Sequence, residues 1–170
     1  MDQAKVQGLQ DLLLKFEGRI GPNSLWQGAI VILAIAIVLQ VLSALLGFLG
    51  LIFSLLGLAL LYPLFCIYAK RFHDAGKPAI WTLAVLAGIW VGALVLGMLL
   101  APLYMGSAIT AAQTGNMGSF ALQAMIVNVL VAIVLHLGAA FAVNRFLKAD
   151  PGPNAYGEPV ADAASPNPLA

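Results

Sequence analysis

Two long stretches of this chain, residues 20–69 and 78–144, contain no Asp, Glu, Lys or Arg. With 62% hydrophobic and 9% charged residues overall, too little polar side-chain surface remains to cover a water-soluble fold. A helix needs about 20 apolar residues to cross a hydrocarbon layer roughly 30 Å thick. The sequence therefore predicts an integral membrane protein of one domain, and it excludes a large soluble domain.

The apolar stretches are long enough for four membrane spans. The run over residues 25–69 would form a helix roughly twice as long as the hydrocarbon layer is thick, so it must fold back near Gly47 and Gly50. Lipid offers no partners to unpaired backbone groups, and runs of this length favour helices over barrel strands. We predict an all-α fold, an integral membrane four-helix bundle with spans at about 25–46, 48–69, 79–101 and 120–146.

The basic residues predict the orientation of these spans. All of them lie before the first span, between the second and third, or around the end of the fourth: Lys5, Lys15, Arg19, Lys70, Arg71, Lys77, Arg145 and Lys148. The positive-inside rule places that side, with both termini, in the cytoplasm. Residues 106–119, on the other side, are uncharged, small and polar, and are predicted to form a loosely structured periplasmic loop.

The two ends of the chain differ from the predicted transmembrane domain at 23–150. In residues 1–22, apolar side chains recur at helical spacing and indicate a short amphipathic helix in the membrane interface, which Gly21 and Pro22 end. These apolar residues are Val6, Leu9, Leu13, Phe16 and Ile20. Residues 151–170 are rich in proline and predict a cytoplasmic tail that is disordered from about residue 161.

Three motifs flank the spans: FEGRIGPNSLW (16–26), AKRFHDAGKPAIW (69–81) and PGPNAYGEP (151–159). Together and in this order they resemble the signatures of domain-of-unknown-function family 805. The chain departs from the family pattern at Pro22, where a second Arg is usual, and at Leu25, where an aromatic residue is usual. The resemblance implies a small four-helix protein of the bacterial inner membrane, and it brings no established biochemical activity.

The polar turn YAKRFHDAGKP (68–78) is the chief candidate for chemistry. Gly76 and Lys77 are not the end of a nucleotide P-loop, because the earlier Gly is missing and Pro78 replaces the metal-binding hydroxyl. His73 and Asp74 would need further ligands to hold a metal, and no nucleophile stands beside them for general-base catalysis. We therefore expect no catalytic residue, no metal and no cofactor.

A structural interpretation of this turn is favoured. Basic residues form a collar at anionic lipid headgroups, Asp74 pairs with Arg71 or Arg19, and His73 hydrogen-bonds the backbone of segment 154–157. The candidate residues of the collar and its clasp are Arg19, Lys70, Arg71, His73, Asp74, Lys77, Arg145, Lys148, Asn154 and Tyr156.

Inside the membrane, two features stand out. His136 is expected to hydrogen-bond across a helix interface, with Asn128, Gln40, Ser43 or Ser54 as partner, because a proton pathway would show several carboxylates or histidines. On the third span, small residues recur at four-residue spacing and predict close helix packing, with this helix at the centre. The two rows contain Ala84, Gly88 and Gly92, and Ala93, Gly97 and Ala101.

Three classes of function fit these observations. We favour a non-enzymatic structural, assembly or accessory partner of a membrane complex. A small transporter or channel is one alternative, and a lipid binder or interfacial enzyme using the His73–Asp74 turn is another. The expected partners are anionic membrane lipids, with a homo-oligomer or a larger membrane complex, and no nucleic acid.

Overall fold

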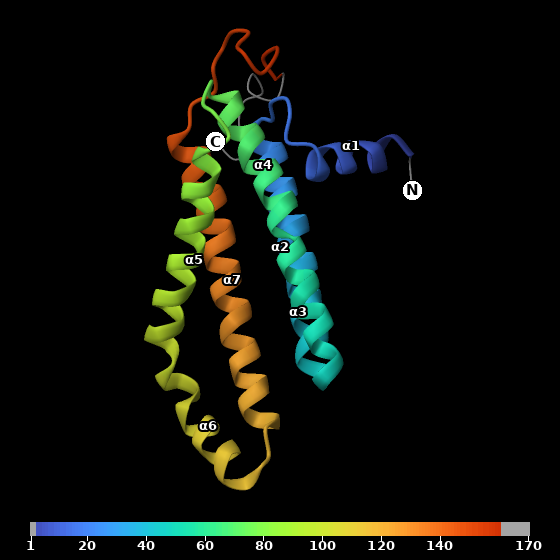
Figure 1. The fold of residues 1–170 in the computed structure, drawn as a ribbon. Coiled ribbons are helices and arrows are strands. Elements are labelled where there is room, and N and C mark those ends of the chain that lie inside the picture. Colours follow the sequence, from blue (N-terminus) through green and yellow to red (C-terminus); the bar gives the residue numbers. More distant parts are fainter. Residues whose placement is uncertain (1–2, 161–170) are drawn as a thin grey trace.

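Helices are the regular structure of the described part of the chain, in which no β-strand occurs (Figure 1). The structure is a computed structural model that describes residues 3–160, with side chains from residue 8 onward. The disorder predicted from about residue 161 therefore lies outside the described residues. In chain order the elements are α1 (Gln3–Leu14), α2 (Pro22–Leu45), the 3₁₀ helix η1 (Gly47–Leu49), α3 (Gly50–Ala59), α4 (Leu61–Asp74), α5 (Trp81–Leu100), α6 (Pro102–Thr114) and α7 (Gly118–Phe146).

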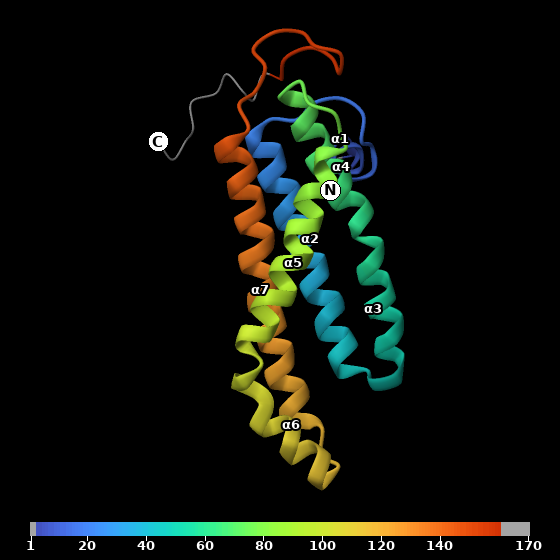
Figure 2. The same cartoon turned by 60° about the vertical axis from the view of Figure 1, so that its left-hand side comes forward.

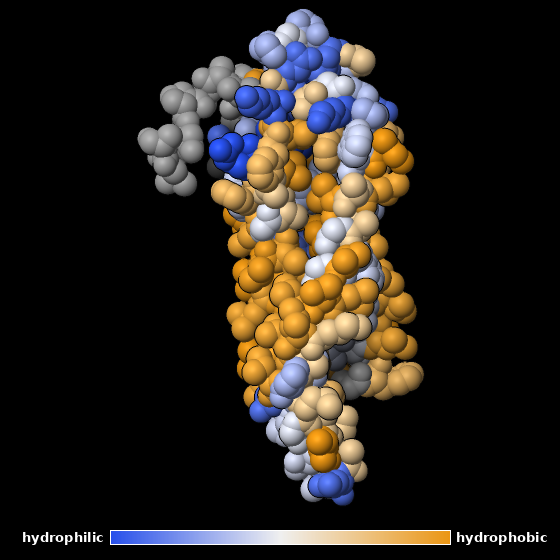
Figure 3. Space-filling model, turned by 90° about the vertical axis from the view of Figure 1, so that its left-hand side faces the viewer, coloured by the Kyte–Doolittle hydropathy of each residue, from blue (hydrophilic) through white to orange (hydrophobic). Residues whose placement is uncertain are grey.

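Four helical stretches are long and apolar enough to cross a membrane: Pro22–Leu45, Gly50–Asp74, Trp81–Leu100 and Gly118–Phe146. Large apolar side chains such as Leu45, Met98 and Leu99 are exposed along them. In Figure 3 a broad apolar region covers the middle of the molecule, and hydrophilic residues gather at the end that carries residues 70–78 and 148–160. The chain is thus an all-helical protein whose spans fit a multi-pass membrane protein.

Prolines account for two breaks in the helices. Pro22 occupies the first turn of α2, where a missing N–H costs nothing. The second span is divided at Leu60, three residues before Pro63. Proline has no N–H to donate and its ring clashes with the carbonyl one turn earlier, so a regular helix cannot run through this point. The Leu60 N–H there bonds the Gly57 carbonyl at 3.2 Å, a tighter turn than the α-helix. The predicted second span is therefore two helices, α3 and α4.

Two local predictions were wrong. The N-terminal helix ends at Leu14, so Phe16 and Ile20 lie beyond it, the first exposed and the second in the core. Residues 102–114 form helix α6 rather than a loose loop. Ala101 keeps helical dihedral angles (φ −50°, ψ −40°), and Pro102 is tolerated in the first turn of the new helix.

The apolar core lies between α2, α4, α5 and α7, near the end that carries residues 70–78. Its buried members are Ile20, Leu25, Ala29, Ile32, Leu64, Ile67, Tyr68, Ile89 and Ala140. Helix α2 contacts α1, α3, α4 and α7, whereas α5 contacts α4, α6 and α7. The prediction that the third span is central was therefore wrong, because α2 has that position.

The helices diverge toward the opposite end. There, α2 and α3 form one hairpin and α5, α6 and α7 form a longer one that projects beyond it (Figures 1 and 2). Among the described elements, α3 contacts only α2, α4 and η1, and α6 contacts only α5 and α7. The two hairpins are thus joined at one end of the molecule only.

Candidate functional site

The buried carboxylate of Asp74, the last residue of α4, lies between two guanidinium groups. Its Oδ1 accepts a hydrogen bond from Arg19 Nε at 3.1 Å, and its Oδ2 accepts one from Arg71 Nη1 at 2.5 Å. The side chains of all three residues are at most 2% exposed. Arg71 precedes Asp74 by one helical turn, whereas Arg19 comes from the segment between α1 and α2. This charge cluster connects α4 to the start of the second helix.

Arg19 also holds the segment that follows α7. Its Nη1 donates to the carbonyls of Gly152 and Gly157 at 2.8 and 3.2 Å. Its Nη2 donates to the carbonyl of Asp150 at 2.6 Å and to that of Asp74 at 3.3 Å. Because these acceptors are far apart in the sequence, one side chain joins three separate parts of the chain.

Arg71 connects α4 with α7, and Asn144 extends that connection to α2. The Arg71 Nε donates to Asn144 Oδ1 at 3.1 Å, and its Nη2 donates to the Leu147 carbonyl at 2.6 Å. Asn144 Nδ2 in turn donates to the Pro22 carbonyl at 3.2 Å. Carbonyls at the end of a helix lack partners in their own helix, and Arg71 supplies one at the end of α7.

The end of α4 is capped by the C-terminal segment. The backbone N–H of Asp150 donates to the Asp74 carbonyl at 2.8 Å, and Asn154 Nδ2 donates to the His73 carbonyl at 3.0 Å. Gly76 follows the helix with φ of +67°, a conformation that favours glycine. We call this set of side chains the polar clasp: Arg19, Arg71, His73, Asp74, Asn144, Asn154 and Tyr156.

His73 enters the polar clasp through its ring. The imidazole stacks on the Tyr156 ring with centroids 3.9 Å apart and planes 3° from parallel. Its Nδ1 lies 3.1 Å from the Gly18 carbonyl and must carry the hydrogen, since a carbonyl only accepts. The expected bond from this ring to the backbone of 154–157 was therefore wrong. An open pocket of about 470 Å³ borders His73, Tyr156 and Glu17.

The remaining basic residues fall into two groups. Lys70, which is 4% exposed, donates from Nζ to the carbonyls of Asp11 and Leu12 at 2.7 and 2.6 Å, and so holds the end of α1. Lys77, Arg145 and Lys148 are exposed. Of the predicted collar, these three lie on the surface, whereas Lys70 and the two arginines of the polar clasp are inside.

The small residues of α5 have different surroundings. A Cβ added at Gly92 would lie 2.7 Å from Leu135 Cδ2 on α7, so the two helices approach closely there. No atom lies within 4 Å of a Cβ placed on Gly88 or Gly97. Ala84 is exposed, and Ala93 lines an apolar cavity of about 270 Å³ between the two hairpins. Another close approach, at Gly28 of α2 against Ile67 of α4, was not predicted.

His136 borders the same apolar cavity. Its Nδ1 donates to the carbonyl of Ala132 in its own helix at 2.9 Å. Asn128 is exposed, and Ser43 and Ser54 bond each other at 2.7 Å. The expected hydrogen bond from His136 across a helix interface is thus replaced by one within α7.

Two residues of the site were missed by sequence reasoning. Asn144 ends the uncharged stretch of the fourth span directly before Arg145, and this position was its only signal. Gly18 has φ of +85°, a conformation that glycine adopts without strain, and it presents its carbonyl to His73. Among the described residues, no three His, Cys, Asp or Glu side chains are grouped so that they could hold a metal ion.

Comparison with known proteins bears directly on the polar clasp. A family described as "Protein of unknown function (DUF805)" matches residues 13–158, a range that contains the whole polar clasp. The chain belongs to the DUF805 family. Searches of curated proteins and of solved structures found no match. The resemblance inferred from the three motifs is confirmed, and in this DUF805 protein each motif contributes to the polar clasp.

Proposed function

We propose that this DUF805 protein is a non-enzymatic accessory or assembly protein of the bacterial inner membrane. The observation that supports this proposal best is that charged residues of the family motifs are buried and bonded within the chain. The side chains of Arg19, Arg71 and Asp74 are buried, both arginines donate to the Asp74 carboxylate, and both also donate to backbone carbonyls. Groups that act on a substrate must be accessible to it, whereas these groups hold segments of the chain together. Motif residues that serve to hold the fold together fit a protein that acts through its folded surface rather than through catalysis.

The orientation belongs to the same proposal. The basic residues of the chain lie at the end with the polar clasp, and the positive-inside rule places this end in the cytoplasm. Exposed Lys77, Arg145 and Lys148 then form a collar at anionic headgroups, with each residue contributing about 1 kcal/mol of attraction.

Cysteine labelling tests the orientation in a Cys66→Ser background. Ser107→Cys should react from the periplasm and Ala155→Cys only after permeabilisation, and reaction of both in intact cells would refute it.

An enzyme that uses His73 and Asp74 is the weaker alternative. Both carboxylate oxygens of Asp74 are bonded to arginines, and the His73 Nδ1 faces the Gly18 carbonyl. Asp74 thus does not orient the imidazole, as a catalytic carboxylate would. Proton transfer through this pair would require the polar clasp to open.

The accessory role is tested by the mass of the extracted particle. The tagged protein is extracted in a mild detergent and its protein mass is measured by light scattering after size exclusion. We expect a mass above the 17.8 kDa of one chain, with the same additional copies or partner in each preparation. A lone monomer in every mild detergent tried would contradict the proposal.

A further inference from the structure

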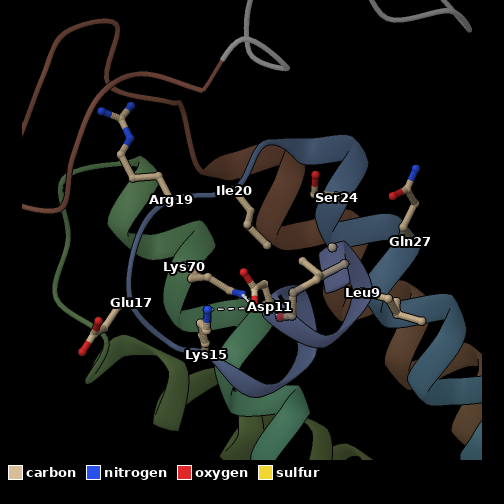
Figure 4. Close-up of a pocket in the computed structure, with 11 residues that line it drawn as sticks. Leu9, Asp11, Lys15, Glu17, Arg19, Ile20, Ser24, Gln27 and Lys70 are labelled. Carbon is tan, nitrogen blue, oxygen red and sulfur yellow. Dashed lines mark hydrogen bonds and ion pairs between the residues drawn. The ribbon is translucent and has the colours of Figure 1, made fainter. Parts of the chain in front are cut away.

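A cavity of about 770 Å³ lies between the second half of α1, the segment that follows it and the first turns of α2 (Figure 4). This volume is typical of sites for small ligands. Its lining combines apolar side chains, such as Leu9 and Ile20, with polar ones, such as Gln27 and Lys70. A cavity with both kinds of lining fits a ligand that is itself amphipathic.

The cavity contains a buried cation. Lys70 is 4% exposed, and its ammonium group donates to the carbonyls of Asp11 and Leu12. An ammonium group has three donors, and these two bonds leave one for a further acceptor. No carboxylate among the described residues lies within ion-pair distance of Lys70. A buried charge is costly without a counter-charge, so an anion in the cavity would bind favourably.

The other charged groups around the cavity have different roles. The Asp11 carboxylate pairs with Lys15 at 2.8 Å, and Arg19 pairs with Asp74 in the polar clasp. Figure 4 shows Glu17 pointing away from Lys70. Of the three cations that line the cavity, Lys70 is therefore the one without an ion-pair partner among the described residues.

The cavity also lies where a membrane lipid can reach it. Helix α1 projects sideways from the upper parts of α2 and α4, nearly perpendicular to both (Figure 1). Leu14 and Phe16, at and just beyond its end, are apolar and about half exposed, as expected of side chains that contact lipid. Helices with this placement lie in the headgroup region, and the apolar parts of α2 and α4 begin directly below it.

We propose that this cavity binds the phosphate group of one anionic phospholipid, with Lys70 donating to a phosphate oxygen and Leu9 and Ile20 contacting the start of the lipid chains. The proposal rests on the membrane location in the proposed function and replaces part of a diffuse collar with one defined site. Charge-assisted hydrogen bonds to phosphate are shorter and stronger than neutral ones, which suits a single buried donor.

The test uses the full-length protein in detergent and counts retained lipids by native mass spectrometry. After incubation with phosphatidylglycerol or phosphatidylcholine, the wild type should retain one phosphatidylglycerol in preference to phosphatidylcholine. Lys70→Gln keeps a donor for the α1 carbonyls but loses the charge, and retention should fall at least about tenfold. Gln27→Trp, which fills the cavity from α2 without changing its charge, should cause a similar loss. Lys148→Gln removes an exposed basic residue of the collar outside the cavity, and its loss of retention should be clearly smaller than that of Lys70→Gln.

Melting temperatures and helical circular dichroism are compared for the same four proteins without lipid, so that a folding defect in Lys70→Gln is recognised. Retention by Lys70→Gln or Gln27→Trp at the wild-type level overturns the proposal. Equal losses in Lys70→Gln and Lys148→Gln also overturn it but leave a diffuse collar, and the proposed function, intact. A further measurement with inorganic phosphate distinguishes a site for a lipid phosphate from a site for soluble phosphate. If inorganic phosphate raises the wild-type melting temperature as much as phosphatidylglycerol does, the site takes soluble phosphate and the lipid proposal fails.

Discussion

At the end with the polar clasp, α2, α4, α5 and α7 share a buried core, and hydrogen bonds of the clasp join α2, α4 and α7. At the opposite end, the α2–α3 hairpin and the α5–α6–α7 hairpin diverge. Helix α3 at the divergent end is at least as apolar as the helices that meet at the clasp end. In lipid, however, apolar faces gain nothing by leaving the hydrocarbon, so helix association depends on close packing and polar bonds. The comparison shows that polar contacts and glycine approaches, rather than hydropathy, decide where these helices meet.

The largest effect on stability is expected when one charge is removed from the polar clasp. Asp74→Asn leaves two buried guanidinium groups without a counter-charge, so we expect a loss of about 3–5 kcal/mol in the free energy of unfolding. Thermal or denaturant unfolding in detergent, followed by circular dichroism, measures the loss. A cost below about 1 kcal/mol would place Asp74 in a solvated environment and would contradict the buried clasp.

The second test compares two glycines of α5. Gly92→Leu would place side-chain atoms into Leu135, and we expect a loss of about 1–3 kcal/mol because the two helices must separate. Gly88→Leu is the matched control, since no atom lies within 4 Å of an added Cβ, and its effect should be within about 0.5 kcal/mol. Equal melting temperatures for the two variants would show that α5 and α7 do not meet at Gly92.

A smaller effect is expected for the ring stack of the polar clasp. His73→Gln removes the stack on Tyr156 and weakens the bond to Gly18, and it should cost about 1–2 kcal/mol. His73→Phe keeps a stacking ring and should recover part of that loss. Melting temperature and metal analysis are measured together. Stoichiometric metal in the wild type, lost in His73→Gln without any fall in melting temperature, would make a metal site the better interpretation.

The smallest effect is expected at the divergent end. Ser54→Ala removes the bond between the hydroxyls of Ser43 and Ser54, which join α2 and α3. Side-chain hydrogen bonds between membrane helices contribute on average about 0.6 kcal/mol, and we expect a loss of that size. A loss as large as that of Asp74→Asn would mean that the two ends are held with equal strength, and the contrast between them would not stand.

The number and approximate bounds of the spans could be predicted because they depend on local composition and length. The chemistry of Asp74 with Arg71 or Arg19 was also anticipated, since a single acidic group among basic ones has few partners. The bond of His73 to Gly18 and the role of Asn144 could not be predicted, because a backbone carbonyl and an uncharged amide have no charge that would indicate which distant group they meet. Helix α6 was missed because its Gly, Ser and Thr residues are typical of loops. In the structure this helix packs against α5 and α7, and the sequence does not show those contacts.

By itself, the sequence determined that this protein is helical, that it has four candidate spans and that its basic residues lie at one end, because hydropathy, length and charge are properties of segments. The tertiary structure decided which basic residues are exposed. Lys77, Arg145 and Lys148 remain on the surface, whereas Arg71 is enclosed by α7 and the segment that follows it. The structure also made α2 rather than α5 the central helix. Helix α5 has three glycines and α2 has one, Gly28, but only the fold places Ile67 against Gly28. The physical reason is that burial and hydrogen bonding depend on which distant segments meet, and in a membrane the apolar pattern of each helix does not specify that choice.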